Sequence, residues 1–552
     1  MTTATKAEAP APATPVAGGN NLAGTRSLIR FILRRDRIRI PVWILALWIT
    51  TVSTANSFST LYKTQADIDA LKDSMNSPAA LSMTGPAHYL TDFNYGSMLS
   101  QQMISTMAVM VGLMSVLLIT RHTRNEEETG RAELLRSTVV GRHAHLASAL
   151  TVAVIVNLAL GLLIAVTLPA LGVDGIDTAG SFLYGLTHTA IGVFFAAVAA
   201  VTVQFTAHTR GASGMALTVI GSAFALRAAG DAGGNDVLSW LSPIGWVQRT
   251  YPYVDNLWWP LLLTFAAAGA LAWTGFRLST RRDVGAGLRA ARLGPATASD
   301  RLTTPLGFAL RLHRGLLIGF LCGMLLFGAM YGSLLGDAEG MLGNVEEIKE
   351  ALDRIGGASL AESFASMVLV ILAIVSSVFV VMAALKPRAE ENAGRAEPLL
   401  ATGLSRTRWV GSHLVSALSG GTLVLLMAGL GLGLAGAGST GDGAMALDLT
   451  GAALAYAPAM WVTAGVGVLL FGWFPRATSA VWIVPVYAFV VGYLGQILQF
   501  PAWLNNLSPF GHVPRMPAAD MDWLPLITLT AVAAALMWAG LAGFRRRDLE
   551  TK

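Results

Sequence analysis

The sequence is poor in charged residues and almost free of cysteine. Only 13% of its 552 residues are charged and 54% are hydrophobic, whereas about a quarter of an ordinary soluble domain is charged. The single cysteine, Cys322, excludes an intrachain disulfide and a metal site built from cysteines. The histidines lack metal-binding spacing, and no nucleophile, base and orienting residue can be assembled. No basic stripe interleaved with aromatics is present, so we expect no enzyme site, no cofactor or metal in this chain, and no nucleic-acid partner.

Long apolar runs are abundant. A helix needs about 20 mostly apolar residues to cross the hydrocarbon core of a bilayer. Twelve such segments can be placed, six in each half of the chain, at 40–58, 103–120, 146–171, 181–205, 212–230, 258–276, 315–336, 366–385, 413–437, 450–472, 479–497 and 524–544. The fold class is therefore an all-α polytopic membrane protein with twelve transmembrane helices.

Two motifs recur at nearly constant spacing. The pattern L-S-P-x-G-x-V-x-R occupies 241–249 and returns 266 positions later at 507–515. The pattern E-E-x-x-G-R-A-E-x-L occupies 126–135 and returns 264 positions later at 390–399. We interpret the chain as two six-span repeats with pseudo-twofold symmetry, an arrangement typical of transporters that enclose a path between their halves.

The expected organisation has four parts. Residues 1–24, rich in Pro, Ala, Thr and Gly, are predicted to be a disordered tail. The first repeat covers 25–283, and it begins with alternating basic and apolar residues over 26–39 that predict an interfacial amphipathic helix. A cytoplasmic linker is expected at 284–305, followed by the second repeat at 306–552.

Basic residues indicate which way the chain crosses the membrane, because cytoplasmic loops carry an excess of Lys and Arg. With both termini inside, the outer loops hold only six of the 38 basic residues: Lys63, Lys72, Arg249, Lys349, Arg354 and Arg515. We therefore expect a multi-pass protein of the bacterial plasma (inner) membrane with both termini cytoplasmic. The net charge of +5 then reflects basic residues that retain the loops between spans on the cytoplasmic face.

The segment after the second span carries more charge than an inner loop needs. Acidic and basic residues mix over 121–142 around the apolar pair Leu134 and Leu135, and a similar segment covers 386–408. Such a mixture fits a helix that stands off the membrane and docks a soluble partner. A solvated helix with i,i+4 ion pairs is the alternative, and the repetition favours docking.

An acidic run, then G-R-x-E-x-L, a basic residue and a new span resembles the coupling region of ATP-binding-cassette permeases of the ABC-2 type. With the L-S-P-x-G motif and the Arg-Arg-Asp ends of both repeats, the chain resembles the duplicated actinobacterial exporters of polyketide antibiotics, the tetronasin-resistance-like group. The resemblance implies that this segment contacts a nucleotide-binding subunit through Glu126, Glu128, Gly130, Arg131, Glu133 and Leu135, and through Glu391, Gly394, Arg395, Glu397 and Leu399. Asn392 replaces Glu128 and Pro398 replaces Leu134, which leaves the equivalence of the two surfaces open.

The chain contains no G-x-x-x-x-G-K-[ST] phosphate loop, so we expect two copies of a separate ATPase subunit carrying Mg-ATP. A smaller inner loop in each repeat contains Arg210 and Arg476. These arginines are candidate secondary contacts to that subunit, although inner-leaflet anchoring is the commoner role of such residues.

A substrate path is suggested by flexible apolar side chains at helical spacing. One stripe comprises Met103, Met107, Met110 and Met114, and a comparable face comprises Met324, Phe327, Met330 and Tyr331. Ordinary helix packing is the alternative. Arg227, a charge within a span, is either structural or a substrate contact. Arg249 and Arg515 are expected to pair with outer acids such as Asp255 or Asp520.

The interpretation that fits best is the permease subunit of an ATP-driven exporter of hydrophobic or amphipathic small molecules in contact with the lipid bilayer. A proton-coupled six-plus-six drug transporter is the main alternative, and the sequence disfavours it because we place no carboxylate within a span. A membrane scaffold that signals without transport is the third possibility.

Overall fold

A computed structural model describes residues 21–137, 140–289, 294, 296–337, 360–494 and 502–549. Within these ranges the regular structure is helical, without strands, and 12 helices are long and apolar enough to cross a membrane. The predicted all-α, twelve-span fold class is confirmed. Most of the predicted tail and part of the predicted linker lie outside the described residues. The chain divides into two compact units: unit 1 within 1–63 and 80–293, and unit 2 within 64–79 and 294–552.

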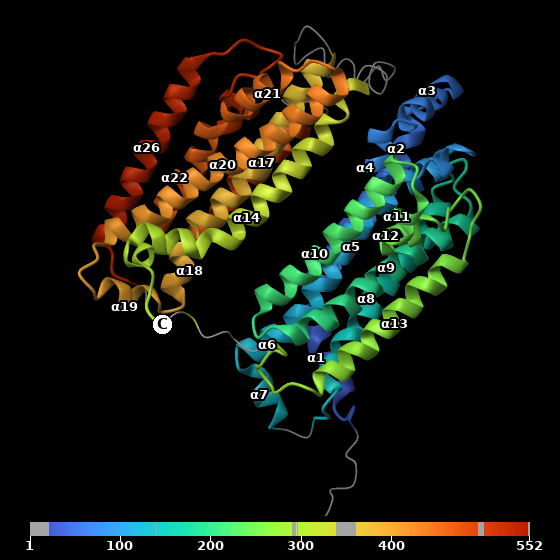
Figure 1. The fold of residues 1–552 in the computed structure, drawn as a ribbon, viewed down its shortest axis with the longest axis horizontal. Helices are drawn as coiled ribbons and strands as arrows, with labels where there is room; N and C mark the ends of the chain where they lie inside the picture. The colour runs from blue at the N-terminus through green and yellow to red at the C-terminus, as the bar shows by residue number, and fades with distance from the viewer. Residues whose placement is uncertain are drawn as a thin grey trace, which may run out of the picture. The chain divides into compact units, whose positions relative to one another are not determined.

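Unit 1 is built from six long helices. They are α2 (Arg39–Leu61), α5 (Tyr95–His122), α8 (Ala144–Ala170), α9 (Thr178–Phe205), α10 (Thr209–Ala232) and α13 (Trp259–Ser279). Helix α9 is the most deeply buried of them, and it packs against α8, α13, α5 and α10 (Figure 1). The backbones of α8 and α9 touch at Gly161 and Gly185, since a Cβ on Gly161 would lie 2.5 Å from the Gly185 carbonyl oxygen. Small residues allow this close approach, as is usual between membrane helices.

Short helices complete unit 1 at the two ends of the bundle. They are α1 (Thr25–Arg35), α4 (Pro78–Met83), η1 (Ala87–Leu90), α6 (Arg124–Glu128), α7 (Arg131–Arg136), α11 (Asp236–Trp240) and α12 (Pro243–Gln248). The predicted amphipathic helix over 26–39 is present, but it breaks at Asp36, where α1 ends. Figure 1 shows α1, α6 and α7 at one end of the unit.

Unit 2 has its own apolar core. Its helices are α3 (Gln65–Met75), η2 (Asp300–Thr303), α14 (Pro305–Gly332), η3 (Leu335–Asp337), α17 (Leu360–Ala384), α18 (Lys386–Asn392), α19 (Ala396–Leu400), α20 (Arg406–Thr440), α21 (Met445–Leu454), α22 (Ala457–Trp473), η4 (Pro475–Trp482), α23 (Ile483–Phe489), η5 (Val490–Leu494), α25 (Ala502–Asn506), η6 (Pro509–His512) and α26 (Trp523–Arg546). Helix α20 packs against α14, α17 and α21, and α22 packs against α26. The eleventh span is irregular, because a 3₁₀ segment, an α-helix and a π turn follow one another over η4, α23 and η5.

The repeated L-S-P-x-G motif forms the same turn in both units. Ser242 caps the N-terminus of α12 and Ser508 caps that of η6, each followed by a proline at the first helical position. A Cβ on Gly245 would lie 2.0 Å from the Ser239 carbonyl oxygen, and one on Gly511 would lie 2.2 Å from that of Asn505. Glycine is therefore required where each turn folds back on the preceding helix. The proline and glycine of the motif thus break the helical path in both units.

Candidate functional site

The acidic motif forms an elbow in each unit. We call residues 124–136 the first elbow and residues 386–400 the second elbow. Helix α6 ends at Glu128, Gly130 adopts a left-handed backbone with φ of 73°, and α7 then begins. In unit 2, Gly394 with φ of 70° separates α18 from α19 in the same way. Only glycine adopts this conformation without a steric cost, which explains the repeated Gly-Arg.

A buried carboxylate ties each elbow to the last long helix of its unit. Glu127 accepts hydrogen bonds from Arg282 Nη1 and Nη2 at 2.7 and 2.8 Å, and one from Arg124 at 2.7 Å. Glu391 accepts two bonds of 2.7 Å from Arg547. The arginines come from the Arg-Arg-Asp ends that follow α13 and α26. Arginine–carboxylate pairs with two parallel hydrogen bonds are strong and geometrically specific. We call each buried glutamate with its arginines a clamp.

Sequence reasoning selected Glu391 but missed Glu127, Arg282 and Arg547 as partners. The signal that could have found them is the co-occurrence, once in each repeat, of an acidic pair and an Arg-Arg-Asp ending. The arginines of the clamp are more deeply buried in unit 1, where the Arg124 side chain is fully inaccessible and also donates to the carbonyl oxygens of Val203 and Ala286.

The glutamate that precedes each clamped glutamate, Glu126 or Glu390, also forms ion pairs within the chain. Glu126 is buried and pairs with Arg35 at the end of α1, with Arg131 at 3.8 Å. Glu390 accepts bonds of 2.6 and 3.1 Å from Arg395, and Lys386 lies 3.1 Å away. The hydrogen-bonded Glu390 carboxylate raises the pKa of Arg395 above its ordinary value. Glu126, Glu391 and Arg395, all predicted to contact a partner, thus have intrachain partners that hold the elbows in shape.

The other predicted docking residues lie mostly on exposed surface. Arg131, Glu133 and Leu134 are exposed on α7, whose last turn contains Leu135, while Ala132 is buried beneath them. Helix α19 repeats this arrangement with Ala396 buried, Glu397 exposed and Leu399 half-buried. Each elbow therefore presents a short helix with charged and apolar side chains outward.

The smaller loop of unit 1 reaches the first elbow. Glu128 accepts a hydrogen bond of 2.9 Å from the backbone nitrogen of Thr209, and His208 lies 3.5 Å from its carboxylate. Arg210, the next residue, is exposed beside this contact. Arg476, at the corresponding place in unit 2, is also exposed. The first elbow thus extends to the start of α10.

The four methionines of the predicted stripe differ in how deeply they are buried. Met107 and Met114 are buried, Met103 is half-buried and Met110 is exposed. In unit 2, Met324 belongs to the core and Met330 is half-buried. Phe327 and Tyr331 pack against that core and contact each other edge to face, with ring centres 5.2 Å apart. Of these residues, Met114 lines the pocket described below.

Arg227 lies in a buried polar cluster at the far end of unit 1 from the first elbow. Its guanidinium donates to the carbonyl oxygens of Leu81 and Met83 at 3.3 and 3.4 Å and lies 3.5 Å from Asp231. Arg249 lies 3.6 Å from Asp231 and 2.5 Å from Asp236.

These contacts correct two expectations. Arg249 was expected to pair with an outer acid such as Asp255, but its acidic partners are Asp231 and Asp236, and Asp255 pairs with His88 at 2.6 Å, because the turn after α11 brings Arg249 back to Asp236 at the start of that helix. Carboxylates also occur within candidate spans: Asp231 lies in Thr209–Ala232, Glu362 in Ala361–Asn392 and Asp448 in Met445–Trp473. The helices extend further than the apolar runs from which the spans were predicted.

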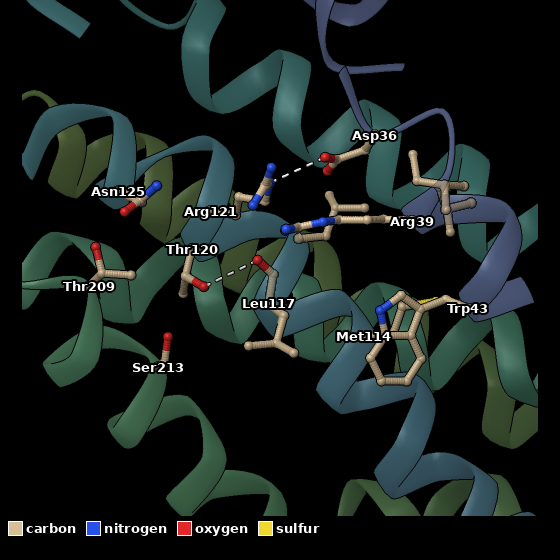
Figure 2. A pocket seen from close by; sticks show the side chains of 13 residues that line it. Asp36, Arg39, Trp43, Met114, Leu117, Thr120, Arg121, Asn125, Thr209 and Ser213 are labelled. Atoms are coloured by element: carbon tan, nitrogen blue, oxygen red, sulfur yellow. Dashed lines mark hydrogen bonds and ion pairs between the residues drawn. The ribbon is translucent and has the colours of Figure 1, made fainter. Parts of the chain in front are cut away.

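A pocket of about 330 Å³ opens in unit 1 where α1 and α2 meet α5, α8 and α10. Trp43, Met114 and Leu118 give it an apolar wall, and Arg39, Arg121 and Asp36 give it a charged rim (Figure 2). Asp36 is buried, with its carboxylate 2.6 Å from His122 Nε2 and 3.2 Å from Arg121 Nε. The pocket lies beside the first elbow, because Asn125 and Thr209 also line it. Among the described residues we find no group of His, Cys, Asp or Glu that could hold a metal ion.

Comparisons with known proteins agree with a transport role. A family model described as the multidrug efflux system permease Rv1217c, C-terminal domain, matches residues 26–278 and 302–545. The multidrug efflux system permease protein Rv1217c of Mycobacterium tuberculosis is 39% identical to this chain over 538 residues, which is 96% of each protein. Both matches cover nearly the whole chain. The chain therefore belongs to the Rv1217c family of multidrug efflux system permeases.

Proposed function

We propose that the chain is the membrane permease of an ABC-2 type exporter, on which two copies of a separate nucleotide-binding subunit dock at the two elbows. The observation that carries this proposal is the repetition of one elbow architecture in both units. Each elbow has a left-handed glycine, a buried carboxylate clamped by an arginine from the last helix, and a short exposed helix. A subunit that bound one elbow would find a similar surface on the other.

The clamps offer a route by which force on an elbow reaches the membrane helices. Helix α6 follows α5 after a single residue, and Glu127 joins it to Arg282 beyond the end of α13. Displacement of α7 would therefore move the ends of α5 and α13 together. In unit 2, Glu391 joins α18 to Arg547 beyond α26. Closure of two ATP-bound subunits would use these connections to shift the units between conformations.

The sequence has no phosphate loop of its own, so ATP with Mg²⁺ would bind to the partner subunit. The excess of Lys and Arg near the elbows favours placing them, and both termini, on the cytoplasmic side of the plasma membrane. The cargo class that suits the apolar lining around Met114 is a hydrophobic or amphipathic small molecule.

Charge reversal on both exposed helices tests the proposal. Glu133→Lys combined with Glu397→Lys should abolish co-purification of the permease with its ATP-binding-cassette subunit, because both docking faces change sign. The matched control is Asp520→Lys, which reverses an exposed acid near the start of α26, at the opposite end of unit 2. Both proteins should elute as folded monodisperse species. Undiminished co-purification of the double variant would refute docking at the elbows.

A proton-coupled transporter is the second candidate, and Asp231 is the observation in its favour. This carboxylate lies within a candidate span, although proton uptake would have to disturb ion pairs to two arginines. Cargo accumulation in proteoliposomes that hold the purified permease alone, with a pH gradient and no ATP, would establish this candidate instead. Accumulation only after addition of the ATPase subunit and ATP would exclude it.

A further inference from the structure

The pocket beside the first elbow has one positive charge that its surroundings do not neutralise. Asp36 is the acidic residue in the lining, and it is already engaged by His122 and Arg121. Arg39 is exposed at the rim, and no ion pair or hydrogen bond joins its side chain to another described residue. Figure 2 shows the guanidinium groups of Arg39 and Arg121 directed toward the same part of the pocket.

The apolar wall lies next to these cations. Trp43, half-buried on α2, and Met114, buried on α5, lie below the rim in Figure 2, and the buried Leu118 of α5 also lines the pocket. The volume of about 330 Å³ is at the lower end of the range for small-molecule sites, which is about 300–1,000 Å³. The pocket thus places an apolar surface and an unneutralised cation within reach of one ligand.

The second half of the chain lacks this chemistry. The pattern F-x-L-R-x-x-R occurs at 31–37 and again at 308–314, which aligns Arg39 with Leu316, and the acidic motif aligns Arg121 with Leu385. By the same alignment Thr120 and Asn125 become Ala384 and Ala389. Leu316 packs against the apolar core of unit 2. Elbow shape does not require these polar groups, because the second elbow forms without them.

We propose that this pocket binds an amphiphile with an anionic head group, a carboxylate or phosphate, held by Arg39 and Arg121 while its apolar body lies along Trp43, Met114 and Leu118. The assignment of this amphiphile as the cargo class of the permease rests on the proposed function. Binding in the first half alone would place the cargo against α5 and Asn125, next to the helix that leads into the first elbow. Neutral and cationic analogues would lose the contact with the guanidiniums.

Equilibrium binding to the purified permease in phosphatidylcholine nanodiscs tests the proposal without any ATPase. The probe is dansyl-undecanoic acid, and its methyl ester is the neutral comparison. Arg39→Gln should weaken binding of the acid about tenfold, equal to about 1.4 kcal/mol, and leave binding of the ester unchanged. Arg37→Gln is the matched control, because Arg37 is exposed two residues away and does not line the pocket. Met114→Trp, which fills the apolar part, should weaken both ligands.

Equal affinity of the wild type and Arg39→Gln for the acid would overturn the proposal, and so would equal loss in Arg37→Gln. Phosphatidylglycerol in the nanodiscs identifies the source of the anion. If phosphatidylglycerol displaces the probe from the wild type but not from Arg39→Gln, the pocket is assigned to a membrane lipid. If phosphatidylglycerol does not displace the probe, the pocket is assigned to a small acid. Failure of the proposed function would instead appear as absent ATP-driven transport with binding intact.

Discussion

The two halves of the chain are alike at their elbows and different in the polar chemistry around them. Both elbows use a glycine with positive φ and an arginine clamp on a buried glutamate. The first half adds the charged pocket at Arg39 and the buried cluster around Arg227 and Asp231. The aligned positions of the second half are Leu316, Tyr493 and Ile497. The parts proposed to meet two identical subunits are thus common to both halves, while polar groups that could serve one cargo exist in a single copy.

The largest loss in the free energy of unfolding is expected when a clamp is broken. Glu127→Gln should lower the free energy of unfolding by about 3–5 kcal/mol, because it leaves buried Arg124 and Arg282 without a counter-charge. Glu391→Gln should cost less, since its partners Arg547 and Arg388 retain 14% and 15% exposure to solvent. Tryptophan fluorescence during titration with a denaturing detergent measures both losses. Equal losses would show that the two clamps are equivalent. The control variant Glu133→Gln should leave the free energy of unfolding unchanged.

The Arg227 cluster can be converted stepwise toward the apolar second half. Arg227→Met should cost about 3 kcal/mol, because Asp231 loses one of its two cations and remains buried. Adding Asp231→Leu should recover part of that loss, since the uncompensated carboxylate is removed. The same detergent titration on both single variants and the double variant gives the coupling energy. Strictly additive losses would contradict an energetic link between Arg227 and Asp231.

The serine caps of the repeated turn differ in two hydrogen bonds. Ser242 Oγ accepts from the backbone nitrogens of Ile244 and Gly245 and donates to the Ala223 carbonyl oxygen at 2.6 Å. Ser508 Oγ accepts from the Phe510 nitrogen at 3.3 Å. Ser242→Ala should therefore cost about 1–2 kcal/mol, and Ser508→Ala should cost less. Thermal unfolding of the two variants side by side measures both losses, and equal losses would show that the two additional bonds of Ser242 do not matter.

The smallest difference is expected at the elbow glycines. Gly130→Ala and Gly394→Ala should each cost about 1 kcal/mol, because alanine is strained in a left-handed backbone. No atom lies within 4 Å of the added methyl group at either position, so packing does not distinguish them. Matched unfolding curves for the two variants are the expected result. A much larger loss at one glycine would mean that its elbow is held more rigidly than the other.

Much of the fold could be predicted because it depends on local composition. A run of about 20 apolar residues must form a helix in a bilayer, where backbone groups have no other partner. The helix break at L-S-P-x-G could be predicted from proline and glycine alone. The partner of Arg249 could not, since both Asp236 and Asp255 are near in sequence and the path of the turn decides between them.

Composition and motif spacing are enough to predict the twelve helices, the two repeats and the position of the charged segment after the second span of each. Only the packed bundle shows that Glu127 and Glu391 bind arginines more than 150 positions away, and that Arg39 and Arg121 line one pocket. The reason is physical. Helix formation follows from the hydrophobicity of neighbouring residues, whereas the pairing of buried charges depends on which distant helix ends are brought together when the bundle packs.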